Sequence, residues 1–310
     1  MQTIVSCGIK VFAEMLKRCV GGELCMGSRC LIELENPILR LGKSGNILYV
    51  ISGKEFIKVD SNTGEILQKA EVFAKDSKTR RFIVDKDVIY CRDFYRLYKI
   101  DAGTMEITSR WELGSDLSSD ICALGSDETN IYASIRNGGF AVINKSSGEV
   151  KTYAVSESSM WDMIVSDRIY AGSVDGNLYV IDKAGFKVLD SKPIHKKNLK
   201  SLLLEGDVIY TASQDLSIAK VNKNTLDVID RKKRCHNKMF YIAGIWQDCL
   251  VTVSPPCGEM KVWNKSDFSL YRTVNRGNWD SFIDGDRLYE KADNRIVCTD
   301  LNGGICFGWS

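Results

Sequence analysis

Short segments of alternating hydrophobic and polar residues recur along this 310-residue chain from about residue 37 onward. The clearest example is Asp167 to Asp182, DRIYAGSVDGNLYVID, in which two alternating segments flank the pair Asp175-Gly176. Alternation with period two is typical of β-strands, and Asp-Gly between two such segments predicts a hairpin turn. A single hairpin cannot bury its own faces, so we expect this unit to be one part of a larger sheet structure.

Two hydrophobic marks repeat in step seven times. The first is an aliphatic residue followed by an aromatic one, or in one unit by a second aliphatic residue, at spacings of 38 to 42 residues: Leu48-Tyr49, Ile89-Tyr90, Ile131-Tyr132, Ile169-Tyr170, Ile209-Tyr210, Leu250-Val251 and Leu288-Tyr289. The second is an apolar strand that ends in Asp or Asn: Asp60, Asp101, Asn144, Asp182, Asn222, Asn264 and Asp300. A period near 40 residues with four short strand signals per unit predicts an all-β, seven-bladed β-propeller of four-stranded antiparallel blades.

In the fourth unit the four strands, named a to d in chain order, are predicted near Trp161 to Val165, Arg168 to Ser173, Asn177 to Ile181 and Phe186 to Asp190. A tight turn such as Ser166-Asp167 precedes strand b, and the closing Asp or Asn after strand c predicts an Asx turn. Helical repeats of similar length do not fit, because the segments alternate with period two and break at Gly or Asp every several residues.

The first 30 residues form a separate extension in this interpretation, with the propeller spanning residues 31–310. Apolar residues spaced three to four apart predict an amphipathic helix at about residues 8–20, which Gly21-Gly22 would end. Two segments could supply the last outer strand of the ring, Ile305 to Trp309 or Arg29 to Glu35 (RCLIELE). We favour a contribution from the N-terminal segment, because ring closure would otherwise depend on side-chain packing alone.

Composition limits the functional classes without choosing one. The 42 Lys and Arg residues nearly balance the 40 Asp and Glu residues, so any affinity for nucleic acid must come from local patches. The 11 cysteines are odd in number and scattered, which favours reduced thiols in a cytoplasmic protein. The N-terminus lacks the basic region and cleavage site of a signal peptide, and no apolar run reaches the roughly 20 residues of a membrane span.

Candidate chemistry is sparse. The chain has 2 histidines, His195 and His236, and its N-terminal cysteines lack the C-x2-C spacing of zinc ribbons, so we expect no metal site. Cys235-His236 could be drawn as a catalytic dyad, but adjacent residues in an extended segment point to opposite sides. We therefore expect no catalytic residues.

Two families share features with these units. Asp167 to Asp182 resembles the repeat of pyrroloquinoline-quinone-type (PQQ-like) propellers, and Tyr210 to Asn222 together with Lys261 to Asn264 looks like WD40 repeats. The resemblance covers about residues 37–310 and implies the fold, not the activity. Lys183 to Phe186 stands where the quinoprotein motif carries its Trp, so no quinone cofactor is expected. Trp263-Asn264 is the pair that approaches the Trp-Asp dipeptide of WD40 repeats.

The loops carry a charge pattern. In a propeller, the d-to-a and b-to-c loops open on one face and the a-to-b and c-to-d turns on the other. Two neighbouring d-to-a loops form a predicted partner-binding surface, here called the basic arc: Lys192, His195, Lys196, Lys197, Lys200, Arg231, Lys232, Lys233, Arg234, His236 and Lys238. The loop after the first blade adds Lys75, Lys78, Arg80 and Arg81, and the opposite face collects acidic residues at the a-to-b turns.

These observations favour a non-enzymatic protein–protein interaction scaffold or a subunit of a larger complex. A basic surface suits an acidic or phosphorylated protein segment, and aromatic residues that could stack on bases are few, so nucleic acid ranks second. The alternative is an enzyme of the propeller class, such as a hydrolase, lyase or dehydrogenase relative, that uses the central channel. The apolar first strands, such as Phe82 to Val84 and Met163 to Val165, argue against it.

Overall fold

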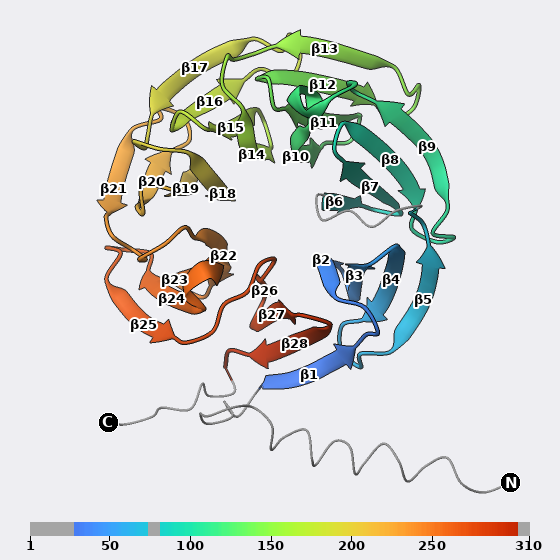
Figure 1. Ribbon diagram of the computed structural model, residues 1–310. Coiled ribbons are helices and arrows are strands. Elements are labelled where there is room, and N and C mark those ends of the chain that lie inside the picture. Colours follow the sequence, from blue (N-terminus) through green and yellow to red (C-terminus); the bar gives the residue numbers. More distant parts are fainter. Residues whose placement is uncertain (1–27, 74–80, 303–310) are drawn as a thin grey trace, which may run out of the picture.

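The structure is a computed structural model that describes residues 28–73 and 81–302. These residues form seven four-stranded antiparallel sheets arranged as blades around a ring (Figure 1). The predicted seven-bladed propeller is confirmed. The helix predicted at residues 8–20, the segment Ile305 to Trp309 and the cations Lys75, Lys78 and Arg80 lie outside the described residues.

Each of the first six blades runs from an inner strand a to an outer strand d. The strands of blades one to three are β2 (Ile38–Ser44), β3 (Ile47–Ser52), β4 (Glu55–Asp60), β5 (Ile66–Glu71), β6 (Arg81–Asp85), β7 (Val88–Asp93), β8 (Arg96–Asp101), β9 (Ile107–Glu112), β10 (Ile121–Ser126), β11 (Asn130–Ile135), β12 (Gly139–Asn144) and β13 (Val150–Ala154). Those of blades four to six are β14 (Met160–Val165), β15 (Ile169–Ser173), β16 (Asn177–Ile181), β17 (Val188–Pro193), β18 (Leu199–Glu205), β19 (Val208–Ser213), β20 (Ile218–Asn222), β21 (Val228–Lys232), β22 (Tyr241–Trp246), β23 (Cys249–Ser254), β24 (Glu259–Asn264) and β25 (Leu270–Val274).

The seventh blade joins the two ends of the described chain. Its inner strands β26 (Phe282–Asp284), β27 (Arg287–Ala292) and β28 (Arg295–Asp300) are completed by β1 (Ser28–Glu33). Strand β1 pairs antiparallel with β28, from Ser28 opposite Thr299 to Glu33 opposite Arg295. The preferred mode of closure, an N-terminal strand added to the seventh sheet, is therefore confirmed.

The repeated aliphatic–aromatic pair lies in strand b of every blade and is buried. Ile169 and Tyr170 in β15 are both fully buried, and the corresponding pairs of the other blades are buried as well. Hydrophobic clusters join neighbouring blades; one packs Tyr170 and Leu178 of blade four against Leu199 and Ile209 of blade five. The core thus consists of contacts between successive blades, which explains why one hairpin is insufficient.

The predicted turns are present in detail. The side-chain oxygen of Asp60 accepts the backbone N–H groups of Asn62 and Thr63, each at 2.8 Å, and Asn144 and Asn222 hold equivalent turns. Gly176, in the b-to-c turn of blade four, has a φ of +88°, and an added Cβ there would collide with the backbone carbonyl of His195. This turn therefore packs directly against the d-to-a loop of its own blade.

One strand boundary was predicted incorrectly. The outer strand of blade four begins at Val188, not at Phe186. Phe186 has a φ of +52° in the c-to-d turn, and its buried ring stacks on Tyr153 with centroids 4.5 Å apart. A large apolar residue in a left-handed turn position is uncommon, so the sequence pattern placed it in the strand.

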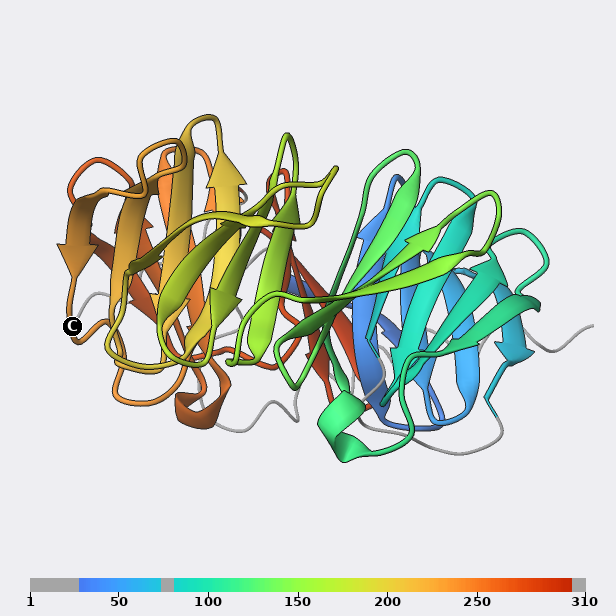
Figure 2. The same cartoon turned by 90° about the horizontal axis from the view of Figure 1, so that it is seen from above.

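Figure 2 shows the ring edge-on, with its turns gathered on two opposite faces. Two short 3-10 helices, η1 (Leu117–Ser119) in a d-to-a loop and η2 (Pro255–Cys257) in a b-to-c loop, lie on the lower face in this view. This agrees with the predicted sorting of the loops between faces. No helix in the described segments is long and apolar enough to cross a membrane.

The acidic face carries its own compensating cations. A lysine directly follows the closing Asp or Asn of strand c in four blades and pairs with an acid on the preceding blade: Lys145 with Asp85, Lys183 with Asp127, Lys223 with Asp167, and Lys265 with Glu205. The acidic residues of this face are thus partly neutralised by ion pairs that cross from blade to blade.

Candidate functional site

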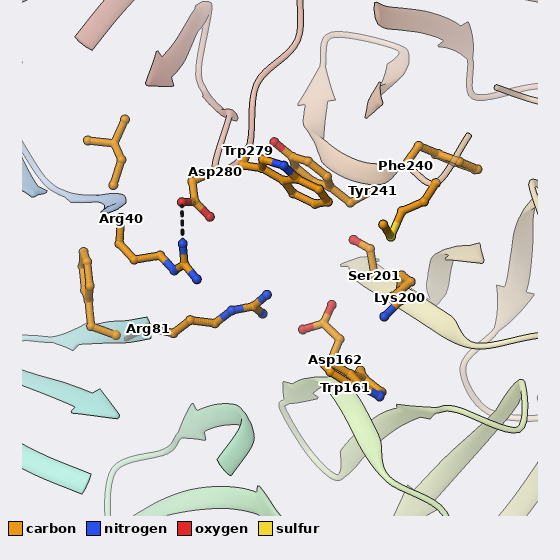
Figure 3. Close-up of a pocket in the computed structure, with 13 residues that line it drawn as sticks. Arg40, Arg81, Trp161, Asp162, Lys200, Ser201, Phe240, Tyr241, Trp279 and Asp280 are labelled. Atoms are coloured by element: carbon orange, nitrogen blue, oxygen red, sulfur yellow. Dashed lines mark hydrogen bonds and ion pairs between the residues drawn. The ribbon is translucent and has the colours of Figure 1, made fainter. Parts of the chain in front are cut away.

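A cavity of about 460 Å³ opens on the d-to-a face at the centre of the ring (Figure 3). Its walls come from the starts of β2, β6, β14, β18 and β22 and from the loop before β26, so six of the seven blades contribute. Because strand a is the innermost strand, its first residues reach the channel mouth. We call this space the central cavity.

Three cations line the central cavity: Arg40, Arg81 and Lys200. Arg40 donates to the carbonyl of Leu39 at 2.7 Å and lies 3.5 Å from a carboxylate oxygen of Asp280, which is also 3.2 Å from Nζ of Lys291. Burial lowers the pKa of Arg40, partly offset by Asp280. Asp280 is therefore already shared between two cations.

Arg81 has a different environment. Its side chain is exposed and extends into the cavity between Arg40 and Asp162 in Figure 3. It makes no ion pair with any residue in the described part of the chain. Its charge lowers the pKa of both Arg40 and Lys200, after the larger effect of their burial.

Trp161 and Asp162 form the opposite side of the cavity. Nζ of Lys200 lies 4.1 Å from the centroid of the Trp161 ring, within the range of a cation–π contact. Asp162 accepts the N–H of Leu202 at 2.7 Å and that of Met163 at 3.1 Å. Burial raises the pKa of Asp162 to about 6, although these hydrogen bonds oppose the shift. The carboxylate thus links strand a of blade four to strand a of blade five.

An aromatic wall faces these charges. Tyr241 and Trp279 stack with their rings 9° from parallel and their centroids 6.2 Å apart. The Tyr241 hydroxyl donates to the carbonyl of Asn278 and accepts the N–H of Ser281, both at 2.7 Å. These bonds hold the pair in place, while Trp279 remains 46% exposed at the cavity mouth.

The prediction that the first strands present only apolar residues to the channel is wrong at its mouth. The triplets from Phe82 to Val84 and Met163 to Val165 are apolar, but a charged residue precedes each triplet, Arg81 in β6 and Asp162 in β14. Lys200, just before Ser201 in β18, occupies a similar place. The recurring charge at the start of strand a was the available signal.

The basic arc is divided by the structure into three groups. Six of its cations are exposed: Lys196, Lys197, Lys232, Lys233, Arg234 and Lys238. Lys192 pairs with Asp227 at 2.9 Å, Arg231 donates to the carbonyl of Ile194, and Lys200 lines the central cavity. The third group, His195 and His236, is buried.

A groove of about 550 Å³ lies between these loops. Pro193 supplies exposed apolar surface, while Lys196, Arg231, Lys233 and Arg234 supply positive charge; Ile194 also lines the groove but is buried. Asp215 and Ser217 also line it and are hydrogen-bonded to each other at 2.5 Å. The d-to-a loops of blades four and five thus lie beside each other on one face, as predicted, and the structure adds a groove between them that is lined by cations.

His195 does not fit the prediction that it contributes to a partner-binding surface. Its Nε2 lies 2.8 Å from the hydroxyl of Thr211 and its Nδ1 lies 2.9 Å from that of Ser217. Burial lowers the pKa of His195 to about 4, with Asp215 opposing and Arg231 reinforcing the shift. The imidazole is neutral and ties the d-to-a loop to strand b and to the b-to-c loop of blade five.

His236 has the same structural role one blade further on. Its Nε2 lies 2.8 Å from Oγ1 of Thr252, to which Nε1 of Trp263 donates at 2.8 Å. Its Nδ1 lies 2.7 Å from Oε1 of Glu259. The imidazole is therefore occupied on both nitrogens and is not available to an outside partner.

The adjacent Cys235 does not form a dyad with His236. Its buried thiol donates to the carbonyl of Lys232 at 3.3 Å, and burial raises its pKa to about 12. A thiol with such a pKa is not a nucleophile at neutral pH. Within the described residues, no group of three His, Cys, Asp or Glu side chains is placed to hold a metal ion.

Solved structures of similar fold support the assignment. The chain is similar to U3-55K (TM-score 0.72, 13% identity, covering 90% of this chain and 100% of that chain). It is also similar to the RRP9 WD40 repeats (0.71, 13%, 88% and 97%) and to the β-propeller domain of Myceliophteria thermophila Cps50 (Swd1) (0.69, 11%, 88% and 99%). No protein-family model matches the sequence, and no curated protein matches it.

At these identities the similarity shows the fold. The chain shares the seven-bladed β-propeller fold of these structures, which agrees at the level of architecture with the resemblance of residues 210–222 and 261–264 to WD40 repeats.

Proposed function

We propose that this propeller is a non-enzymatic protein–protein interaction scaffold or a subunit of a larger complex, and that it binds its partner through the basic arc. One observation carries the proposal. The six exposed cations of the arc lie on two adjacent loops and at the end of β21, and none of them makes an ion pair with a described residue. On the opposite face, by contrast, lysines pair with acids of the neighbouring blade.

The groove between the loops suggests the chemistry of the partner. Apolar surface from Pro193 lies beside Arg231, Lys233 and Arg234, a combination suited to an acidic or phosphorylated protein segment. None of the described lining residues is Phe, Tyr or Trp, so the groove offers no platform on which bases could stack. This favours a protein partner over nucleic acid.

A charge-reversal experiment tests this role. The variant carrying Lys232→Glu, Lys233→Glu and Arg234→Glu should lose a partner that the wild-type protein recovers stoichiometrically from native lysate. All three side chains are exposed, so the fold should be unaffected. The matched control carries Lys86→Glu, Arg168→Glu and Lys187→Glu, three exposed cations at a-to-b and c-to-d turns, and it should retain the partner.

Equal recovery by both triple variants would remove the basic arc from the proposal. Binding to mixed oligonucleotides with a steep dependence on salt concentration would favour nucleic acid as the partner instead. A metal or organic cofactor found by native mass spectrometry would favour an enzyme that uses the central channel.

We also propose that the protein works in the cytoplasm. Six described cysteines, Cys30, Cys122, Cys235, Cys249, Cys257 and Cys298, are free, and three of these are buried as thiols: Cys122, Cys235 and Cys298. Thiols in such number are typical of a reducing compartment.

A further inference from the structure

The central cavity has an imbalance of charge that the scaffold role does not explain. Three cations, Arg40, Arg81 and Lys200, line it together with two carboxylates. Asp280 is shared by Arg40 and Lys291, and Asp162 accepts two backbone N–H groups. The carboxylates are thus engaged by their own surroundings, and the lining carries excess positive charge.

Further cations behind the cavity increase this excess. Arg92 is buried, lies 3.3 Å from Asp120, and shares that carboxylate with Arg136 at 2.7 Å. Burial and then the charge of Arg81 lower the pKa of Arg92 to about 10. Arg81 therefore has several like charges around it and one opposite charge, Asp162, whose pKa it lowers. Its exposed guanidinium could offer up to five N–H donors to a ligand. An oxyanion beside Arg81 would relieve this repulsion and accept a paired hydrogen bond.

Two other features of the lining point to a ligand with both polar and planar parts. On one side, Nζ of Lys200 lies 4.1 Å from the centroid of the Trp161 ring, so this ammonium group is held at the lining. Across the cavity, Trp279 is stacked on Tyr241 and is exposed at the mouth (Figure 3). One side thus offers donors, and the other offers an aromatic surface.

We propose that the central cavity binds an oxyanion, a phosphate or carboxylate group, joined to a planar ring, with the oxyanion at Arg81 and Lys200 and the ring against Trp279 and Tyr241. A volume of about 460 Å³ falls in the range of small-molecule sites, which spans roughly 300–1,000 Å³. The oxyanion could be carried by a free small molecule or by one side chain of a protein segment, and the cavity would recognise the same group in both.

Calorimetric titration with three simple probes tests the site. At low ionic strength, phenyl phosphate should bind, inorganic phosphate should bind more weakly because it lacks the ring, and phenol should not bind detectably. Arg81→Gln should weaken phenyl phosphate binding at least tenfold. Arg81→Lys keeps the charge but loses the planar guanidinium, so its affinity for phenyl phosphate should lie between those of the wild type and Arg81→Gln.

Matched controls separate this site from the basic arc. Arg168→Gln removes an exposed arginine from the opposite face and should bind phenyl phosphate as the wild type does. The Lys232→Glu, Lys233→Glu, Arg234→Glu variant should also bind it normally, even if it loses its protein partner. A phosphotyrosine peptide that binds more tightly than phenyl phosphate, with the same dependence on Arg81, would support the site and assign its ligand to a protein segment.

Two results would overturn the proposal. One is a calorimetric titration in which phenyl phosphate at millimolar concentration gives no heat of binding with folded wild-type protein. The other is equal affinity in the wild type and in Arg81→Gln, with circular dichroism showing that both are folded.

Discussion

His195 shows how strongly a residue's role depends on its surroundings in this propeller. It sits in a loop among lysines, yet its side chain is buried and bonded to Thr211 and Ser217. The same pattern at His236 and Thr252 shows that each of the two histidines holds a d-to-a loop onto the following blade. The exposed lysines that surround them are therefore presented from a rigid base.

The lowered pKa of His195 predicts a dependence of stability on pH. Because its pKa falls from 6.5 to about 4 on folding, the neutral form is favoured in the folded state. The contribution of His195 to the free energy of unfolding is fully present above pH 6.5. It decreases by up to about 3 kcal/mol as the pH falls towards 4. Urea unfolding of the wild type and of His195→Gln across this range should show a smaller loss in the variant.

The neighbouring exposed Lys196→Gln variant serves as the control and should keep the wild-type pH dependence. Asp162, whose raised pKa acts in the opposite direction between pH 4 and 6, is present in all three proteins and cancels in the comparison. An identical slope in the wild type and His195→Gln would show that His195 does not carry the effect.

At the scale of elements, the sequence was most informative where a local pattern has a local cause. Strand b of blade four and its Asp175-Gly176 turn lie where the alternation predicted, because period two and turn chemistry act within a few residues. The start of β17 was misplaced because Phe186 is held in its turn by Tyr153, a contact with the preceding blade. Met105, Leu226 and Phe268 occupy the same turn position in other blades with positive φ, so comparison of the repeats, and not the alternation within one blade, marks this residue.

Substitution of two glycines with positive φ allows the cost of the backbone conformation to be measured apart from the cost of steric crowding. Gly176→Ala should destabilise the protein by about 2 kcal/mol or more, because the left-handed conformation is costly for Ala and the new methyl would meet the carbonyl of His195. Gly206→Ala should cost only about 1 kcal/mol, since Gly206 has a φ of +57° and no atom within 4 Å of an added Cβ. If urea unfolding gave equal free energies of unfolding for Gly176→Ala and Gly206→Ala, the crowding at Gly176 would be contradicted.

At the scale of the whole molecule, the ring is held by contacts between blades and closed by β1. Leu31 of β1 is buried in a cluster with Tyr289 and Ile296 of the seventh blade and Leu48 of the first. This strand therefore joins the two ends of the described chain in one core.

Shortening Leu31 should weaken this closure. Leu31→Ala should lower the free energy of unfolding by about 2–3 kcal/mol, because it leaves a cavity between two blades. Leu67→Ala, in the outer strand β5 where Leu67 is 49% exposed, should cost less than about 1 kcal/mol. Denaturant unfolding of both variants measures the difference, and a cost at Leu31 no larger than at Leu67 would show that β1 adds little to ring closure.

The sequence by itself determined the number of blades, the strand order within each and the position of most turns. It did so because each blade repeats one pattern of alternation and turn residues, and these act over short distances. It also predicted that the loops around Pro193 and Arg231 would share one basic surface.

Only the tertiary structure decided which side chains of that surface are accessible and what lines the channel. Arg40 and Asp280 are 240 residues apart in sequence and meet because the ring closes. Arg81, Trp161 and Lys200 come from three different blades and converge for the same reason. A site assembled from the starts of five inner strands and the loop before a sixth has no spacing that a sequence pattern can display, since its geometry arises from the closed ring.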